Sequence, residues 1–133
     1  MSGGFFTDAG ALAAALDRSG VAAMAAVHTT MEHSAQALKA RVQQAASGRP
    51  GPNVITGRYR ASWEAQVTGA GPVVTAEVGT SAPQARRLEY GFVGADSLGR
   101  VYNQAPRPHL GPAVQEAGPV MLDKLGLAVR AVL

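Results

Sequence analysis

Apolar residues recur at steps of three and four through the first third of the chain, which is the spacing of one face of an α-helix. The stripe predicts a helix over about residues 21–46 and consists of Met24, Val27, Met31, Ala35, Leu38 and Val42. A shorter helix precedes it, capped by Thr7 or Asp8 and ending near Asp17. Because Ser and Gly lower helix propensity, residues 18–20 predict a break between the two helices.

Apolar and polar residues alternate in the middle of the chain, which is the period of a half-buried strand. One face of the run 58–68 carries Tyr59, Ala61, Trp63, Ala65 and Val67. Residues 73–80 alternate in the same way, and the glycines and proline of residues 69–72 favour a turn between the two runs. The two runs therefore predict an antiparallel hairpin with one wet face.

A short helix is predicted after this hairpin. Ser81 can cap a helix that begins near Pro83, and Gly91 offers the positive φ that ends one. Glu89 then lies in the last turn, where the helix dipole disfavours a carboxylate. We therefore expect a cationic partner for Glu89, and Arg107, held between two prolines, is one candidate.

The last third of the chain completes the predicted fold. Residues 92–105 are polar and Gly-rich, and they fit either a long mobile loop or a loose hairpin with a strand near residues 100–103. Residues 106–108 are extended by their prolines, and a helix runs from about residue 111 to Val132 with a pause at residues 118–119. Together the elements predict an α+β fold: an antiparallel β-sheet built on a hairpin, with a long N-terminal helix, a short helix and a C-terminal helix packed on one face.

Length and composition narrow this picture. The 133 residues suit a single domain over 1–133, with residues 1–6 as a flexible arm. The chain has no cysteine, no basic signal-peptide start and no apolar run near the about 20 residues of a membrane helix, so we expect a soluble protein without membrane contact. Because 26 residues are alanine and only 7 are aromatic, the core should be made of small side chains, and neighbouring subunits should stabilise it.

Arginine dominates the basic residues. The net charge is +3, ten of the twelve basic residues are Arg, and the excess lies within residues 49–113. A guanidinium pairs with carboxylate or phosphate in a bidentate way, which favours a role at interfaces. A GC-rich genome produces the same bias, so both explanations stay open.

No catalytic pattern emerges from the sequence. His28 and Glu32 lie four apart on a helix without a second histidine beside them, and we interpret them as surface residues, while His109 is expected to pack in the place of an aromatic ring. The chain lacks a phosphate-binding Gly-Lys-Ser/Thr loop, a Gly-x-Ser-x-Gly nucleophile elbow and a paired acid motif. We therefore expect no enzyme, no metal and no cofactor.

Four short motifs follow one another along the chain: residues 56–62 (TGRYRAS), 78–83 (VGTSAP), 88–91 (LEYG) and 107–113 (RPHLGPA). In this order and spacing, over about residues 20–130, the chain resembles the head-tail joining, or tail-completion, family of tailed phages. Three positions depart from the family pattern, which often has an aromatic residue, Thr and Phe where this chain has Gln84, Phe92 and His109.

The resemblance implies a non-enzymatic virion protein of the phage neck, assembled in the host cytoplasm. Such a protein forms a homo-oligomeric ring, hexameric or dodecameric with the hexamer as our expectation, between the head connector or stopper protein and the tail tube protein. Double-stranded DNA passes through its channel without sequence-specific binding. The resemblance does not distinguish a head-tail joining protein from a tail terminator.

Residue roles follow from this resemblance and from the charge pattern. We assign the subunit or ring interface to Glu89, Tyr90, Arg107, Arg58 and Ser62. Contacts with the DNA channel or an adjacent ring are assigned to Arg60, Arg86, Arg87 and Arg100. Docking on the next ring is assigned to residues 92–105 and to an arm that contains Phe5 and Phe6.

Two of these assignments have plainer alternatives. Arg86 and Arg87 also fit a solvated helix face, and Ser62 fits ordinary turn chemistry. A second function of another class, a small basic nucleic-acid-binding module acting alone, stays open as well. Against it, a net charge of +3 is small and no recognition helix with clustered arginines is visible.

Overall fold

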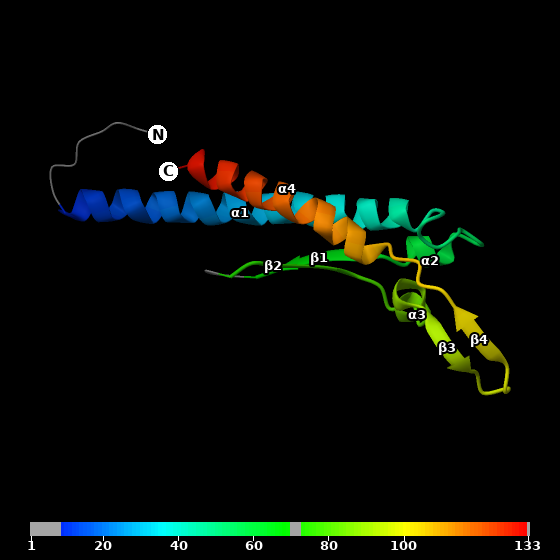
Figure 1. Ribbon diagram of the computed structural model, residues 1–133. Helices are drawn as coiled ribbons and strands as arrows, with labels where there is room; N and C mark the ends of the chain where they lie inside the picture. The colour runs from blue at the N-terminus through cyan, green and yellow to red at the C-terminus, as the bar shows by residue number, and fades with distance from the viewer. Residues whose placement is uncertain (1–8, 70–72, 133) are drawn as a thin grey trace.

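A computed structural model describes residues 9–69 and 73–132 of the chain (Figure 1). One long helix, α1 (Ala9–Ala45), runs the length of the molecule and packs against both strands of a β-hairpin, while the C-terminal helix α4 (Leu110–Arg130) lies along it. A second hairpin projects from one end of the molecule, and the start of α1 lies at the other end. The predicted α+β class, with its long, short and C-terminal helices, is confirmed.

Helix α1 is continuous, so the predicted break at residues 18–20 is wrong. A single helical glycine costs only about 1 kcal/mol relative to alanine, and the alanine-rich flanks of Gly20 offset that cost. The apolar stripe from Met24 to Val42 is confirmed, since its members are half-buried or buried. The proposed caps Thr7 and Asp8 lie outside the described residues.

The first hairpin is shorter than predicted. Strands β1 (Glu64–Thr68) and β2 (Thr75–Gly79) pair antiparallel with Val67 opposite Ala76, and their exposed and half-buried residues alternate as expected. The predicted strand start at Arg58 is wrong, because α2 (Arg58–Ala61) is a single helical turn. Local chemistry explains it: Gly57 has a φ of 81°, and the Thr56 hydroxyl accepts the Arg58 N–H at 3.2 Å.

The short helix α3 (Ala85–Tyr90) begins later than predicted, and its N-cap position is Gln84, whose side chain makes no capping hydrogen bond. The predicted cap at Ser81 is therefore wrong. Gly91 ends the helix with a φ of 79°, as predicted. A side chain at Gly91 would meet the Gln104 carbonyl oxygen at 2.7 Å, which adds a steric reason for glycine.

The structure decides between the two alternatives for residues 92–105. Strands β3 (Phe92–Ala95) and β4 (Val101–Gln104) form a second antiparallel hairpin, so the hairpin alternative is confirmed, while the mobility of this segment stays a prediction. Helix α4 continues through Pro119, so the predicted pause at residues 118–119 is wrong.

The core is small. Among the described residues, the fully buried apolar side chains are Ala35, Val42, Ala46, Trp63 and Ala113. Three of these five are alanine, as the composition suggested. The cluster lies where α1, β1 and the first turn of α4 meet, and partly buried Leu38, Tyr59, Val78 and Leu110 pack around it. This end of the hairpin therefore holds the best-packed part of the described chain.

Length and hydropathy alone would allow α1 to cross a membrane. This is a weak indication, because the core helix of a globular protein and an N-terminal signal sequence meet the same criterion. Helix α1 packs against β1, β2 and α4, although none of the apolar window that meets this criterion is buried within the described structure.

The position of the core predicts that substituting two valines of α1 will change the free energy of unfolding by different amounts. Val42 is 0% exposed and Val21 is 72% exposed. Replacing Val42 by Ala should lower the free energy of unfolding by about 2 kcal/mol, because it removes buried methyl groups and leaves a cavity. Val21→Ala is the control and should change it by less than about 0.5 kcal/mol. Chemical denaturation measures both, and equal midpoints for the two variants would contradict this location of the core.

Candidate functional site

The carboxylate of Glu89 joins the end of α3 to the start of α4. It accepts three backbone N–H groups: His109 at 2.9 Å, Leu110 at 3.1 Å and Gly111 at 2.9 Å. These are N–H groups that the first turn of a helix leaves without a partner, and a negative charge is favourable there. Glu89 is thus unfavourably placed on its own helix and favourably placed on the next one.

This contact replaces the cationic partner that the sequence suggested for Glu89. Arg107 contributes through its backbone instead, since its N–H donates to the Leu88 carbonyl at 2.7 Å. The second hairpin leaves the body just after Glu89 and returns just before Arg107. The two contacts therefore clamp the base of the β3–β4 hairpin.

The contacts of this clamp also shift the pKa of Glu89. Burial alone would raise the pKa of this carboxyl, but the N–H groups of Gly111, His109 and Leu110, together with the charge interaction with His109, lower it below its ordinary value of 4.5. The carboxylate is therefore the stable form in the folded chain at neutral pH.

His109 is 1% exposed and has a partner on each ring nitrogen. Nδ1 lies 2.7 Å from the Arg107 carbonyl oxygen, which can only accept, so Nδ1 carries the proton. Nδ1 also lies 3.0 Å from Glu89 Oε2, and Nε2 forms a hydrogen bond of 2.5 Å with the Tyr59 hydroxyl. Burial, followed by the charge of Glu89, raises the pKa of Tyr59 to about 12, so this hydroxyl keeps its proton at neutral pH. The expectation that His109 is packed is confirmed.

Three aromatic rings surround this hydrogen-bond chain. Tyr59, Trp63 and His109 meet edge to face, with ring centroids 5.6 to 6.2 Å apart. Tyr59 and Trp63 lie four residues apart at α2, so both can point toward His109 at the start of α4. The junction thus ties α2, α3 and α4 to the core.

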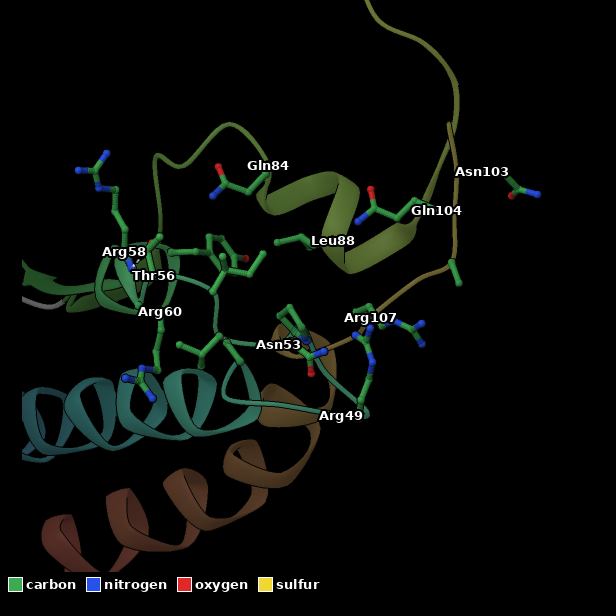
Figure 2. Close-up of a pocket in the computed structure, with 17 residues that line it drawn as sticks. Arg49, Asn53, Thr56, Arg58, Arg60, Gln84, Leu88, Asn103, Gln104 and Arg107 are labelled. Carbon is green, nitrogen blue, oxygen red and sulfur yellow. Dashed lines mark hydrogen bonds between the residues drawn. The ribbon is translucent and has the colours of Figure 1, made fainter. Parts of the chain in front are cut away.

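A cavity of about 790 Å³ opens beside the junction, among the loop after α1, α2, α3 and the segment from β4 to α4 (Figure 2). Its basic lining residues are Arg49, Arg58, Arg60 and Arg107, and its amides are Asn53, Gln84, Asn103 and Gln104. None of the described residues that line it is acidic. We call this cavity the arginine groove.

The arginines of this groove are not neutralised within the described residues. The Arg49 guanidinium donates to the Gly51 carbonyl at 3.2 Å and that of Arg60 to the Ser47 hydroxyl at 3.3 Å, both uncharged acceptors. In Figure 2, Arg49 and Arg107 gather at one end of the groove with Asn53, while Arg58 and Arg60 extend at the other. Such an arrangement can bind a carboxylate or phosphate group.

The structure brings together only some of the residues that the sequence assigned to interfaces. Arg58, Arg60 and Arg107 share the arginine groove. Tyr90 is exposed on α3. The Ser62 hydroxyl bonds the Tyr59 carbonyl oxygen at 2.5 Å and the Thr80 hydroxyl at 2.6 Å, so it links α2 to the end of β2. An interface role for these residues stays a prediction.

The other assigned residues lie apart from the groove. The Arg87 guanidinium lies 4.0 Å from the centroid of the Phe92 ring, and Arg86 is exposed on the same helix. Arg100 pairs with Asp96 at 2.7 Å across the turn of the second hairpin. Phe5 and Phe6 lie outside the described residues.

The partners of Glu89 were not identified from the sequence, and neither were Arg49 and Asn53 as lining residues of the arginine groove. The signal for the first was present, because a carboxylate at a helix end followed about 20 residues later by a proline-flanked helix start is a possible cap. Arg49 and Asn53 follow the predicted end of the long helix and were given no role. No local pattern shows that this segment meets Arg107.

Removing the Glu89 carboxylate should destabilise the folded chain. We expect Glu89→Ala to lower the free energy of unfolding by about 2 kcal/mol at pH 7, because three N–H groups lose a charged acceptor. The control is Glu77→Ala, on the exposed face of β2.

The pH dependence follows from the lowered pKa of Glu89. The folded chain binds fewer protons than the unfolded chain between the folded pKa and 4.5, so the stabilisation is present above 4.5 and is lost as the pH falls through the folded pKa. Thermal unfolding from pH 7 to pH 2.5 should show a smaller acid-induced loss in Glu89→Ala than in the unaltered chain. Parallel pH profiles for the two proteins would refute the clamp.

Comparison with known proteins gives one match. Residues 10–91 fit the model of a family named for bacteriophage HK97-gp10 and described as tail components. Searches of curated proteins and of solved structures found no significant match. The matched segment holds α1, the first hairpin and α3 up to Gly91, which includes the Glu89 side of the clamp. The chain therefore belongs to the HK97-gp10-like family of phage tail components, in agreement with the resemblance to head-tail joining proteins.

Proposed function

We propose that the chain is a structural subunit that closes into a ring in the neck of a tailed phage, where it joins the head connector to the tail tube around the DNA channel. Membership of a tail-component family supports a location in the virion and contacts with other virion proteins. The ring, its position in the neck and the passage of DNA are our inference.

The observation that carries the proposal is the poor burial of bulky apolar side chains. Fifteen large apolar side chains are exposed among the described residues, whereas the described core holds few bulky side chains, chiefly Val42 and Trp63. Exposed apolar surface of this extent marks interaction sites. Eleven of the fifteen lie on α1, α4 and the second hairpin, so several separate faces are available for partners.

The shape of the chain favours a ring over a two-fold dimer. The first turns of α1 extend past the first hairpin at one end of the molecule, and the second hairpin projects at the other (Figure 1). Two unlike ends suit a heterologous interface, in which one face binds a different face of the next copy. Such an interface makes a closed ring when the rotation closes.

The arginine groove supplies a second kind of surface. Arg49, Arg58 and Arg60 are exposed, so their guanidinium groups can pair with the anionic groups of a partner that covers the groove. In a neck, this partner is an acidic segment of an adjacent protein or the phosphate backbone of the DNA. The proposal assigns the groove to contacts between rings, and it assigns no catalysis to the chain.

Native mass spectrometry tests this function. The purified chain, at rising concentration and with its tail tube and head connector proteins, should give one closed oligomer of defined copy number, which we expect to be six. A chain that stays monomeric under all these conditions would contradict the ring. Tight, salt-sensitive DNA binding by that monomer would instead support the nucleic-acid-binding alternative.

A further inference from the structure

The second hairpin has one covered face and one bare face. In the register that pairs Gly94 with Tyr102, the Phe92 and Tyr102 rings share a face, with centroids 6.3 Å apart, and Arg87 covers Phe92. On the other face Val93 is 78% exposed and Val101 is 80% exposed. This apolar face has no cover within the described residues.

A hairpin of this kind needs a support. Two strands alone are marginally stable in water. Strands β3 and β4 pack mainly on each other, and Figure 1 shows them projecting away from the helices. The Glu89 clamp holds only the base of the hairpin, so its outer half presents Val93, Val101 and the 75% exposed Leu98 to whatever lies beside it.

An apolar groove elsewhere in the chain fits such a hairpin. It encloses about 340 Å³ where α1, β2 and α4 meet, with Met31, Leu38, Val78 and Met121 along it. Val114 and Val120 at this groove remain 46% and 51% exposed. The Ser34 hydroxyl also lines it and has no hydrogen-bond partner among the described residues. We call this cavity the helix groove.

We propose that the bare face of the β3–β4 hairpin docks in the helix groove of a second copy of the chain. The hairpin cannot fill the groove of its own chain, because it points away from α1 and α4 at the far side of α3 (Figure 1). Both surfaces are apolar, both are exposed, and each chain has one of each.

A protrusion on one copy and a groove on the next form a heterologous contact that repeats around a ring. This inference rests on the ring proposed above and specifies its interface. The arginine groove begins at the base of the hairpin, where Asn103 and Gln104 line it. The docking proposed here uses Val93 and, further out, Val101 and Leu98.

Cysteine crosslinking tests the contact cleanly, because the chain has no cysteine of its own. Val101→Cys places a thiol on the hairpin and Val120→Cys places one at the helix groove. Oxidation of a mixture of the two single variants should give a covalent dimer that contains one of each. The double variant should give a ladder of oligomers that ends at the ring. Each single variant alone should stay uncrosslinked.

Val21→Cys is the matched control, since Val21 is 72% exposed on α1 and does not line the helix groove. Mixed with Val101→Cys, it should give no crosslinked dimer. A charged variant, Val101→Asp, should remain folded and raise the protein concentration needed for half-assembly at least about tenfold.

The outcomes separate this inference from the proposed function. A ring that forms in native mass spectrometry while Val101→Cys crosslinks to itself, to Val21→Cys or only to another virion protein would overturn the docking and keep the ring. A ring unaffected by Val101→Asp would do the same. A chain that never assembles would overturn both.

Discussion

The bond between the Glu89 carboxylate and the first N–H groups of α4 fixes how the two ends of the fold meet. It spans about 20 residues of sequence and closes the base of the β3–β4 hairpin. His109 is buried beside this bond, and it contacts Tyr59 through a hydrogen bond and through ring packing. Tyr59 in turn packs against the core. Without this junction, α3 and the hairpin would lose their charged contact with the first turn of α4.

The rigid part of the molecule and its interaction surfaces are consequently separate. A small core around Val42 and Trp63 holds α1, β1 and α4 together, and the junction extends that rigidity to α3. The surfaces beyond it are either charged, as at Arg49 and Arg107, or apolar, as at Val101. A subunit of an assembly needs this division, because its contacts must be held in place before the partner arrives.

The sequence predicted the elements whose signals are local and strong. The stripe of α1, the alternation of both strands of the first hairpin and the stop at Gly91 all appear in the structure. The predicted breaks at Gly20 and Pro119 failed because neighbouring helix formers and packing outweigh one poor residue. The alternation from Tyr59 to Val67 misled the strand assignment, because its first part is the single turn α2 and only residues 64–68 form a strand.

The site was only partly predictable, because its contacts join distant segments. Glu89 was recognised as misplaced, but its partners are backbone groups that exist only once α4 has docked. Amide hydrogen exchange by NMR tests the clamp most directly. The account predicts that the His109, Leu110 and Gly111 amides exchange slowly at neutral pH, and much faster in Glu89→Ala, while amides near Val42 stay protected. Equal exchange at these three amides in both proteins would contradict it.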